Sequence, residues 1–251
     1  AANPLARLPS FPSPNLSLAA DLGDGFEALL ARTNGKRKRK KHRSQTRKFE
    51  AAGGFRRLCA RTTEEVHSLL YAFFAMKEFR FRRMGIANVF GDPQVRTFFH
   101  KLFADALKEE RPPFLLHGLE VAGKLRAVTG SSISGRRLIC EFGAIAEDDL
   151  ANASPGDFLF FENIQEAGES GFSVYDFSVG DEPYKRLWCE IETRHLDVLV
   201  PLSLKGRTLA FCLHRNARIK AFIKNSPKIW TLTKALRRRT AGKRQPTDDD
   251  G

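Results

Sequence analysis

The sequence has few cysteines and no pattern typical of a metal site. Its four cysteines, Cys59, Cys140, Cys189 and Cys212, include no C-x-x-C pair and no histidine at the spacing of zinc ligands. We therefore expect free thiols in a reducing compartment and no bound metal. No apolar run reaches the roughly 18 residues of a membrane-spanning helix, and no stretch has the charged, apolar and cleavage regions of a leader. These absences predict a cytoplasmic protein.

Positive charge is concentrated in two segments. The chain has 42 lysines and arginines against 29 acidic residues. Residues 36–48, which begin with Lys36 and end with Lys48, hold nine of the basic residues and no acid, and residues 234–244 hold six more. Without these 15, the remaining 27 basic residues face 29 acidic ones, so the body is nearly neutral. The two segments predict contact with a polyanion, an anionic membrane surface or a phosphate-bearing substrate, without choosing among them.

The totals fit a globular chain with extensions at its ends. Of the 251 residues, 42% are hydrophobic and 28% are charged, near the averages of globular proteins. Residues 1–20 are rich in proline and serine and predict an arm or linker that ends in a short extended piece. We expect one domain over residues 21–239, with a helical part (21–112), a sheet core (113–215) and a C-terminal helix (216–239). A disordered tail follows over residues 240–251.

Helical patterns dominate the first half of this domain. Residues 35–52 are good helix formers with almost no apolar face before Phe49, which is typical of a helix that bridges solvent or is held by a ligand and neighbouring charge. Residues 62–65 read as a capping box, and apolar residues follow it at helical spacing to about Arg83. Asp92 and Pro93 start a further helix. The first half therefore predicts helices around one short strand over residues 55–61.

The second half changes to the period of strands. Residues 114–120, 124–133 and 136–145 are separated by turn residues and predict an antiparallel meander. A helix over residues 155–169 then leads to a strand over residues 172–177, with Phe172, Val174 and Asp176 on one face. As a right-handed crossover, this helix makes the strands before and after it parallel. Residues 194–202 and 208–214 are predicted as a final hairpin, and a helix from residue 216 closes the fold.

These patterns predict a mixed α/β fold of the α+β class. The sheet is mostly antiparallel with one parallel pair, and helices flank it. Because the strands cluster instead of alternating with helices, a doubly wound sheet is excluded. A cleft where the manner of strand pairing changes is a natural ligand site.

Three strings of the second half carry a resemblance to a known family. LLHGLEVAGKLRAV (115–128), SPGDFLFFENIQEAGESG (154–171) and YDFSVGDEPYKRLW (175–188) resemble the CelD/BcsL-like acyltransferases of the GNAT superfamily, which are related to FemAB peptidyltransferases. The basic segment before Gly53 also matches, and the resemblance covers about residues 26–214. It implies a GNAT-like sheet that binds acyl-CoA where its fourth and fifth strands splay apart. It also implies a further N-terminal portion in full-length relatives, and a role in bacterial cellulose or exopolysaccharide synthesis.

The start of the helix at Pro155 is the candidate donor site. Ser154, Pro155 and Asp157 predict a capping box, and the free amides of a helix start suit a pyrophosphate. Gly156 permits close approach, and Phe158 lies in the same turn. The resemblance implies that this terminus binds coenzyme A, although the usual R/Q-x-x-G-x-G/A pattern is absent and Asp157 adds a negative charge. Acyl-CoA is the expected co-substrate, and another donor stays open.

Four residues are candidates for the chemistry. The resemblance implies that Lys185 faces the reacting carbonyl or a phosphate and that Tyr184 protonates the leaving thiolate. The other interpretation is a surface lysine and a packing tyrosine. Asp176 and Glu141 are acids on otherwise apolar strands, where burial requires a partner. Glu141 is the candidate general base unless it faces outward, and Asp176 is either catalytic or paired with Lys185, Arg186 or a backbone cap.

Further basic and aromatic residues are candidates for binding. Lys77, Arg80 and Arg83 line an anionic acceptor pocket if they face the cleft, and Trp188 is the aromatic candidate beside them. The segment at residues 36–48 is either a solvated face or a site for an anionic ligand, a lipid surface or tRNA. A lipid surface there would place the protein at the inner membrane. Aromatic residues that stack on bases are not interleaved with it.

The sequence thus predicts an acyl-CoA-dependent N- or O-acyltransferase that acts on a sugar or cell-envelope precursor. Direct transfer is expected because no cysteine occupies a convincing nucleophile position. Two alternatives stay open: an inactive GNAT-fold accessory module of polysaccharide synthesis, and an aminoacyl-tRNA-dependent transferase of the FemAB type. The acceptor and the length of the acyl chain are not defined by the sequence.

Overall fold

The computed structural model describes residues 4–8 and 10–225. Its strands are β1 (Ser10–Asp21), β2 (Phe55–Cys59), β3 (Phe114–Val121), β4 (Lys124–Ser134), β5 (Arg137–Ile145), β6 (Val174–Val179) and β7 (Ile191–Val198). Its helices are η1 (Pro4–Arg7), α1 (Gly25–Arg32), α2 (Gly35–Ala51), α3 (Thr63–Met84), α4 (Pro93–Ala106), η2 (Ala151–Ala153), α5 (Pro155–Glu169), α6 (Pro183–Arg186) and α7 (Leu204–Asn225).

The chain divides into two compact units. The first unit comprises Ala1–Ser17, Met84–Ile86 and Glu192–Gly251 and holds α7, the start of β1 and most of β7. The second unit comprises Leu18–Arg83 and Ala87–Ile191 and holds β2 to β6 with helices α1 to α6. All candidate site residues lie in the second unit, so the site is described within it.

The strands follow the order β2-β3-β4-β5-β6-β1-β7. The antiparallel pairs are β2 with β3, β3 with β4, and β4 with β5. The strands β5 and β6, which are connected through α5, pair in parallel. The predicted meander, the crossover helix and the parallel pair are therefore confirmed. The mixed α/β fold class, with a mostly antiparallel sheet flanked by helices, is confirmed with them.

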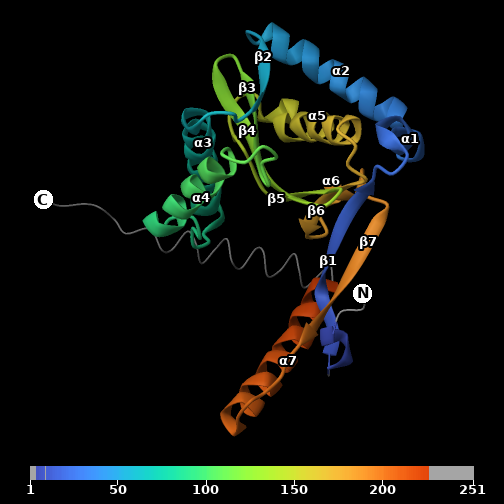
Figure 1. The fold of residues 1–251 in the computed structure, drawn as a ribbon, viewed down its shortest axis with the longest axis vertical. Helices are drawn as coiled ribbons and strands as arrows, with labels where there is room; N and C mark the ends of the chain where they lie inside the picture. The colour runs from blue at the N-terminus through green and yellow to red at the C-terminus, as the bar shows by residue number, and fades with distance from the viewer. Residues whose placement is uncertain (1–3, 9, 226–251) are drawn as a thin grey trace, which may run out of the picture. The chain divides into compact units, whose positions relative to one another are not determined.

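Two helical layers cover opposite faces of the sheet in the second unit (Figure 1). On one face, α3 and α4 pack Phe73, Phe74 and Phe103 against Leu116 and Val128. On the other face, α5 packs apolar side chains against β3 to β6; they are Phe158, Leu159, Phe161, Ile164 and Ala167. Alternate residues of β3, β4 and β5 thus pack on opposite faces of the sheet, as the period of a strand requires.

Two predicted helix starts in the second unit are confirmed by their caps. The amide of Glu65 donates to Thr62 Oγ1 at 3.2 Å, and Glu65 Oε2 accepts from the amide of Thr62 at 3.3 Å, which completes a capping box. Asp92 Oδ1 accepts from the amide of Gln94 at 2.8 Å, with Pro93 in the first turn. No helix in residues 4–8 and 10–225 is both long enough and apolar enough to cross a membrane.

The predictions for both ends of the chain need correction. Residues 208–214 lie inside helix α7, so the final hairpin was wrong. The turn expected at Gly206 is the first turn of this helix, where Ser203 Oγ accepts from the amide of Gly206 at 3.0 Å. The neighbour of β7 is instead β1, a strand of 12 residues in the region expected to be an arm. The tail at residues 240–251 and the end of the predicted C-terminal helix lie outside the described residues.

Candidate active site

The parallel pair β5 and β6 opens into a fork. Its registered pairs run only from Arg137 with Val174 to Ile139 with Asp176, whereas β5 continues to Ile145 and β6 to Val179. Just beyond the last pair, a bulge in β5 leaves Glu141 between Cys140, which pairs with Ser131, and Phe142, which pairs with Gly130. Unpaired strands beside a bulge make an opening in a sheet, as expected for a ligand site. We call this opening the fork.

Tyr184 of α6 lies beside the fork. Its ring stacks on Phe160 of α5, with centroids 5.6 Å apart, and meets Phe177 of β6 edge-on at 6.2 Å. The residue is 39% exposed, so part of it faces solvent. Burial and the carboxylate of Glu182 raise the pKa of Tyr184 well above its usual value, while the charge of Arg80 opposes the rise. Tyr184 is therefore a protonated hydroxyl at neutral pH, in a form that can donate a proton.

Lys185 is buried and holds the end of β6. It is only 5% exposed, and its Nζ donates to the carbonyl of Val179 at 3.0 Å and pairs with Glu182 Oε2 at 2.9 Å. The interpretation as a surface lysine is wrong. Because its donors are already engaged by a strand end and a carboxylate, the geometry favours a role in fixing α6 and Tyr184 over contact with a reacting carbonyl.

The two acidic candidates differ in their surroundings. Asp176 Oδ2 accepts from Arg137 Nη1 at 2.7 Å, and its Oδ1 accepts from the amide of Ser178 at 2.7 Å. Asp176 is thus a structural residue at the last paired rung of the fork: the backbone cap that we expected is present at Ser178, and Arg137 takes the place of Lys185 or Arg186 as the charged partner. Glu141 is exposed at the bulge and accepts from Ser132 Oγ at 2.6 Å, so it bears no cost of burial. Glu141 stays a candidate base on the open side of β5.

The start of α5 differs from the predicted capping box. Ser154 has a left-handed backbone (φ 56°) and makes no capping hydrogen bond through its side chain. The carbonyls of Ala153 and Ser154 instead accept from Gln45 Nε2 of α2, at 2.9 and 3.0 Å. Asp157 pairs with Lys41 Nζ at 3.0 Å, so the negative charge that seemed to disfavour phosphates is compensated.

Gly156 is a packing glycine. A Cβ built there would lie 2.6 Å from Ile145 Cγ2 of β5. The close approach that a glycine permits here is therefore between α5 and the end of β5, and Pro155 and Phe158 are buried in the same turn.

We expect Gly156→Ala to lower the free energy of unfolding by about 1–2 kcal/mol, since the added methyl must displace Ile145. Urea unfolding followed by circular dichroism measures this change. Gly143→Ala is the matched control on β5, because a Cβ there meets its neighbours at ordinary distances of 3.5 Å. Equal free energies of unfolding in the two variants would show that the contact of residue 156 with Ile145 does not restrict the packing of α5 on β5.

A cationic pocket lies on the α2 side of the start of α5. The pocket has a volume of about 120 Å³ and is lined by residues of α1, α2, α5 and α6 with their flanking turns: Thr33, Asn34, Arg37, Lys38, Lys41, Gln45, Asp157, Phe161, Leu187 and Trp188. With Lys41 paired to Asp157, two positive charges remain, those of Arg37 and Lys38. A pocket with excess positive charge beside a helix start suits a phosphate. We call it the cationic pocket.

Lys38 is the most enclosed of these cations. Its Nζ lies 4.8 Å from the centroid of the Trp188 ring and donates to the carbonyl of Thr33. Burial lowers the pKa of Lys38, the charge of Arg37 adds to this effect, and Asp157 and Glu190 oppose it. Trp188 is 3% exposed, so it forms a wall of the pocket and offers little free surface for stacking a substrate.

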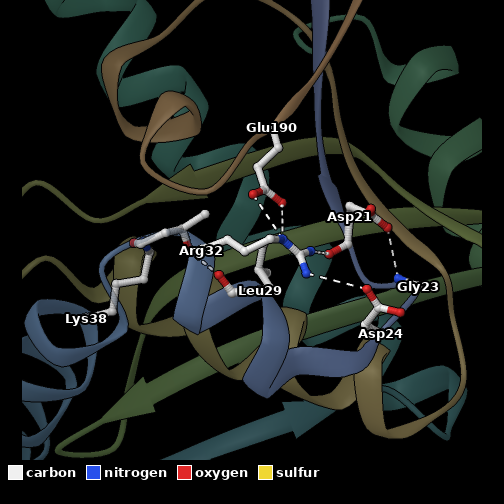
Figure 2. Close-up of polar contacts among 8 residues, drawn as sticks. Asp21, Gly23, Asp24, Leu29, Arg32, Lys38 and Glu190 are labelled. Carbon is white, nitrogen blue, oxygen red and sulfur yellow. Dashed lines mark hydrogen bonds and ion pairs between the residues drawn. The ribbon is translucent and has the colours of Figure 1, made fainter.

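Arg32 fixes the neighbouring wall of the cationic pocket (Figure 2). Its guanidinium donates to both carboxylate oxygens of Glu190 at 3.1 Å and to the carbonyl of Asp21 at 2.9 Å. The C-terminus of α1, where Lys38 also binds, is thereby held against the segment after α6 (Figure 2).

The basic helix α2 has an inner face that the apolar pattern did not reveal. His42 stacks between Phe158 and Phe161 of α5, at 4.4 and 4.2 Å, and its Nε2 lies 2.6 Å from Glu162 Oε1. With Gln45 and Phe49, this side chain forms a stripe at helical spacing against α5. Of the two alternatives for this polar helix, the one in which neighbouring charge holds it is confirmed, and its inner stripe escaped the apolar pattern because most of the stripe is polar.

A polar network between α5 and the sheet was also missed. Asn163 of α5 accepts from Arg57 of β2 at 2.9 Å and donates to Thr129 Oγ1 of β4 at 3.0 Å. The contact with His117 and the ion pair with Arg57 lower the pKa of Glu166 to about 2. His117 is buried, and burial lowers its own pKa. These groups lie on β2, β3, β4 and α5, far apart in the sequence, so only the fold brings them together.

The acceptor candidates separate into two groups. Arg83 Nη1 pairs with Glu147 Oε2 at 2.6 Å, and Arg82 pairs with Glu78 at 2.8 Å. Lys77 and Arg80 have no carboxylate partner among the described residues. Lys77 Nζ lies 5.7 Å from the ring centroid of Phe73, and Phe73 packs on Phe142 of β5 beside the bulge, so this cation lies on the α3 side of the fork. No group of three or more His, Cys, Asp or Glu in residues 4–8 and 10–225 is arranged to hold a metal ion.

Comparisons with known proteins agree with this geometry. A family model described as an acetyltransferase (GNAT) domain matches residues 36–186, which is more than half of the chain. The crystal structure of FemX is similar with a TM-score of 0.52 and 12% identity, over 71% of this chain and 59% of FemX. The structure of L-PGS from Bacillus licheniformis is similar with a TM-score of 0.50 and 13% identity, over 80% of this chain and 64% of L-PGS.

At these identities the likeness to FemX and L-PGS concerns the fold. The chain spans less than two thirds of the length of either structure. No curated protein matches the chain.

Proposed function

Because the chain belongs to the family of GNAT acetyltransferase domains, we propose that it is an acyltransferase whose donor is an acyl-CoA. The observation that carries the proposal is the fork between β5 and β6 with the protonated Tyr184 beside it. An opening in a sheet, a proton donor and a cationic pocket are the three features that a thioester with phosphates requires.

The residues of the chain fit such a donor along one path. Tyr184 and Trp188 lie four residues apart, so α6 and the turn after it contribute both to the fork and to the cationic pocket. Phe160 and Phe161 of α5 do the same, since the first stacks on Tyr184 and the second lines the pocket. A donor with its phosphates at Arg37 and Lys38 would therefore extend along α5 and α6 to reach Tyr184.

The proposed reaction is a direct transfer. An amine or hydroxyl of the acceptor attacks the thioester carbonyl, the carbon–sulfur bond breaks, and the leaving sulfur takes the proton of Tyr184 while the acceptor gives up one proton. The exposed carboxylate of Glu141 is the proposed acceptor of that proton. Cys140 is unsuited to covalent catalysis, because burial raises its pKa to about 12 and leaves a thiol.

Binding of the donor is tested by isothermal titration of acetyl-CoA and longer acyl-CoAs into the protein. We expect saturable binding that weakens about tenfold in the double variant Arg37→Gln, Lys38→Gln, since two charges of the cationic pocket are lost. The matched control is Lys40→Gln, Arg43→Gln, which removes two charges from exposed positions of the same helix.

Absence of binding to every acyl-CoA would contradict the donor. Equal weakening in the control would mean that α2 acts only through its overall charge, and that the cationic pocket is not the phosphate site.

A second candidate donor is an aminoacyl-tRNA. The observation that favours it is the set of exposed cations that α2 carries outside the lining of the cationic pocket: Lys36, Lys40, Arg43, Arg47 and Lys48. The resemblance to FemAB peptidyltransferases, which take an aminoacyl-tRNA as donor, points the same way, and FemX and L-PGS share the fold. A gel-shift titration with tRNA distinguishes the two donors, because the control variant at Lys40 and Arg43 should weaken tRNA binding while leaving acyl-CoA binding unchanged.

For the acceptor, we propose a saccharide or cell-envelope precursor, on the resemblance of residues 175–188 to the CelD/BcsL-like acyltransferases. The open side of the fork at Glu141 and Ser132 offers exposed hydrogen-bonding groups to such a molecule.

A further inference from the structure

We propose that Lys77 and Arg80 of α3 bind an anionic group of the acceptor, either a carboxylate or a phosphate ester. That the bound molecule is the acceptor rests on the proposed function, whereas the anion site itself rests on the geometry of α3.

The first observation is the contrast between these two cations and the neighbouring cations of α3 and α4. Arg82 and Arg96 both pair with Glu78, at 2.8 and 3.3 Å, and Arg83 pairs with Glu147 at 2.6 Å. In the same part of the second unit, Lys77 and Arg80 have no carboxylate partner among the described residues. Since like charges three residues apart repel on a helix surface, this pair carries a cost that a bound anion would offset.

The second observation is the apolar surroundings of Lys77. Its Nζ lies 5.7 Å from the ring centroids of both Phe73 and Phe81, and the side chain is partly buried. Phe73 in turn packs on Phe142 of β5, with centroids 4.5 Å apart. Burial and the charge of Arg80 lower the pKa of Lys77. A desolvated ammonium beside a guanidinium binds an anion more strongly than two solvated cations do.

The third observation places the pair beside the fork. The ring of Phe73, over which Lys77 Nζ lies, packs on Phe142 of β5, and Phe142 follows Glu141 at the bulge. Arg80 lies three residues further along α3, and its charge opposes the rise in the pKa of Tyr184. The pair thus lies in the layer of α3, on the face of the sheet opposite α5 (Figure 1).

The position also assigns the anion to the acceptor. The cationic pocket, which suits the phosphates of the donor, is formed on the α5 side of the sheet by α2. Lys77 and Arg80 approach the fork from the α3 side. A donor and an acceptor that enter from opposite faces can meet at the fork without competing for the same cations.

The test follows the Lys77 amine directly. The full chain is labelled with 13C at the lysine Cε, the Lys77 signal is assigned by its loss in Lys77→Met, and its titration is recorded by NMR at constant ionic strength. Inorganic phosphate and acetate are added in separate arms, with chloride as reference. We expect saturable binding that raises the midpoint of Lys77 by roughly one pH unit. A larger effect of phosphate indicates a phosphate ester, and a larger effect of acetate indicates a carboxylate.

The controls are two arginine variants of the same helix. Arg80→Gln should weaken anion binding at Lys77 at least about threefold, whereas Arg82→Gln, which removes an exposed cation paired with Glu78, should leave it unchanged. An unmoved midpoint in both anions, or equal weakening in the two variants, overturns the proposal.

This experiment needs no turnover, so it separates the two claims. If acyl-CoA does not bind but Lys77 responds to phosphate, the proposed donor fails and the anion site stands. If transfer is observed and Lys77 does not respond, the anion site fails and the proposed function stands. Once an acceptor that the enzyme acylates has been identified, Lys77→Gln should raise the KM for that acceptor and leave the KM for acyl-CoA unchanged.

Discussion

Replacing Tyr184 with phenylalanine should lower kcat for acyl transfer by about 100-fold, the usual effect of losing a general acid. The aromatic ring remains, so its stacking on Phe160 and its edge contact with Phe177 are kept. The fold should therefore be retained, with a midpoint of urea unfolding close to that of the parent protein. Transfer is measured by release of free coenzyme A from acetyl-CoA.

The pH dependence of the parent enzyme provides a second readout for Tyr184. Because burial raises the pKa of Tyr184 above its usual value near 10, the hydroxyl keeps its proton throughout the neutral range. The alkaline loss of activity that depends on this group should begin only above about pH 10. An unchanged kcat in Tyr184→Phe would show that Tyr184 serves only in packing.

Replacing Lys185 with methionine should lower the free energy of unfolding by about 2 kcal/mol. The variant leaves the carbonyl of Val179 and the carboxylate of Glu182 without their buried donor. Lys108→Met is the matched control, since Lys108 makes the same type of pair with Asp105, three residues earlier at 2.6 Å, on the surface. It should change stability by less than about 0.5 kcal/mol.

The same variant distinguishes a positioning residue from a catalytic one. If Lys185 holds α6, then Lys185→Met should lower stability and also raise the KM for the donor, because Tyr184 and Trp188 lie on either side of it. If Lys185 polarises the reacting carbonyl, kcat should fall with little change in stability. Urea unfolding and steady-state kinetics on one preparation separate these outcomes.

The central part of the chain was predictable because local patterns and fold agree there. Turn residues and alternation gave the three strands from residue 114 to residue 145, and the crossover through Pro155–Glu169 gave the parallel pair. The alternation that placed Tyr175 and Phe177 on one face is seen in their burial. The ends differ because β7 has β1 as its neighbour, at the other end of the sequence. No local pattern specifies such a partner.

Polar packing explains what the sequence did not predict at the site. His42 and Gln45 bind α5 through stacking and hydrogen bonds, so α2 has an inner face without an apolar period. Serine is a typical N-cap residue, but Ser154 has a left-handed backbone and makes no capping hydrogen bond through its side chain. Gln45 of α2 donates to the carbonyls of Ala153 and Ser154 instead. Lys77, Arg80 and Arg83 are equivalent by sequence, and only the position of Glu147 in the fold separates Arg83 from the other two.

The most direct test of the fork as the site of acyl transfer is photo-crosslinking with an acyl-CoA that carries a diazirine in its acyl chain. After irradiation, digestion and mass spectrometry locate the modified residues. Crosslinks should fall on residues at the fork, chiefly Glu141, Phe160 and Tyr184, and excess acetyl-CoA should suppress them. Crosslinks confined to other surfaces, or crosslinks that acetyl-CoA does not suppress, would contradict the assignment of the fork as the place where the acyl group is bound.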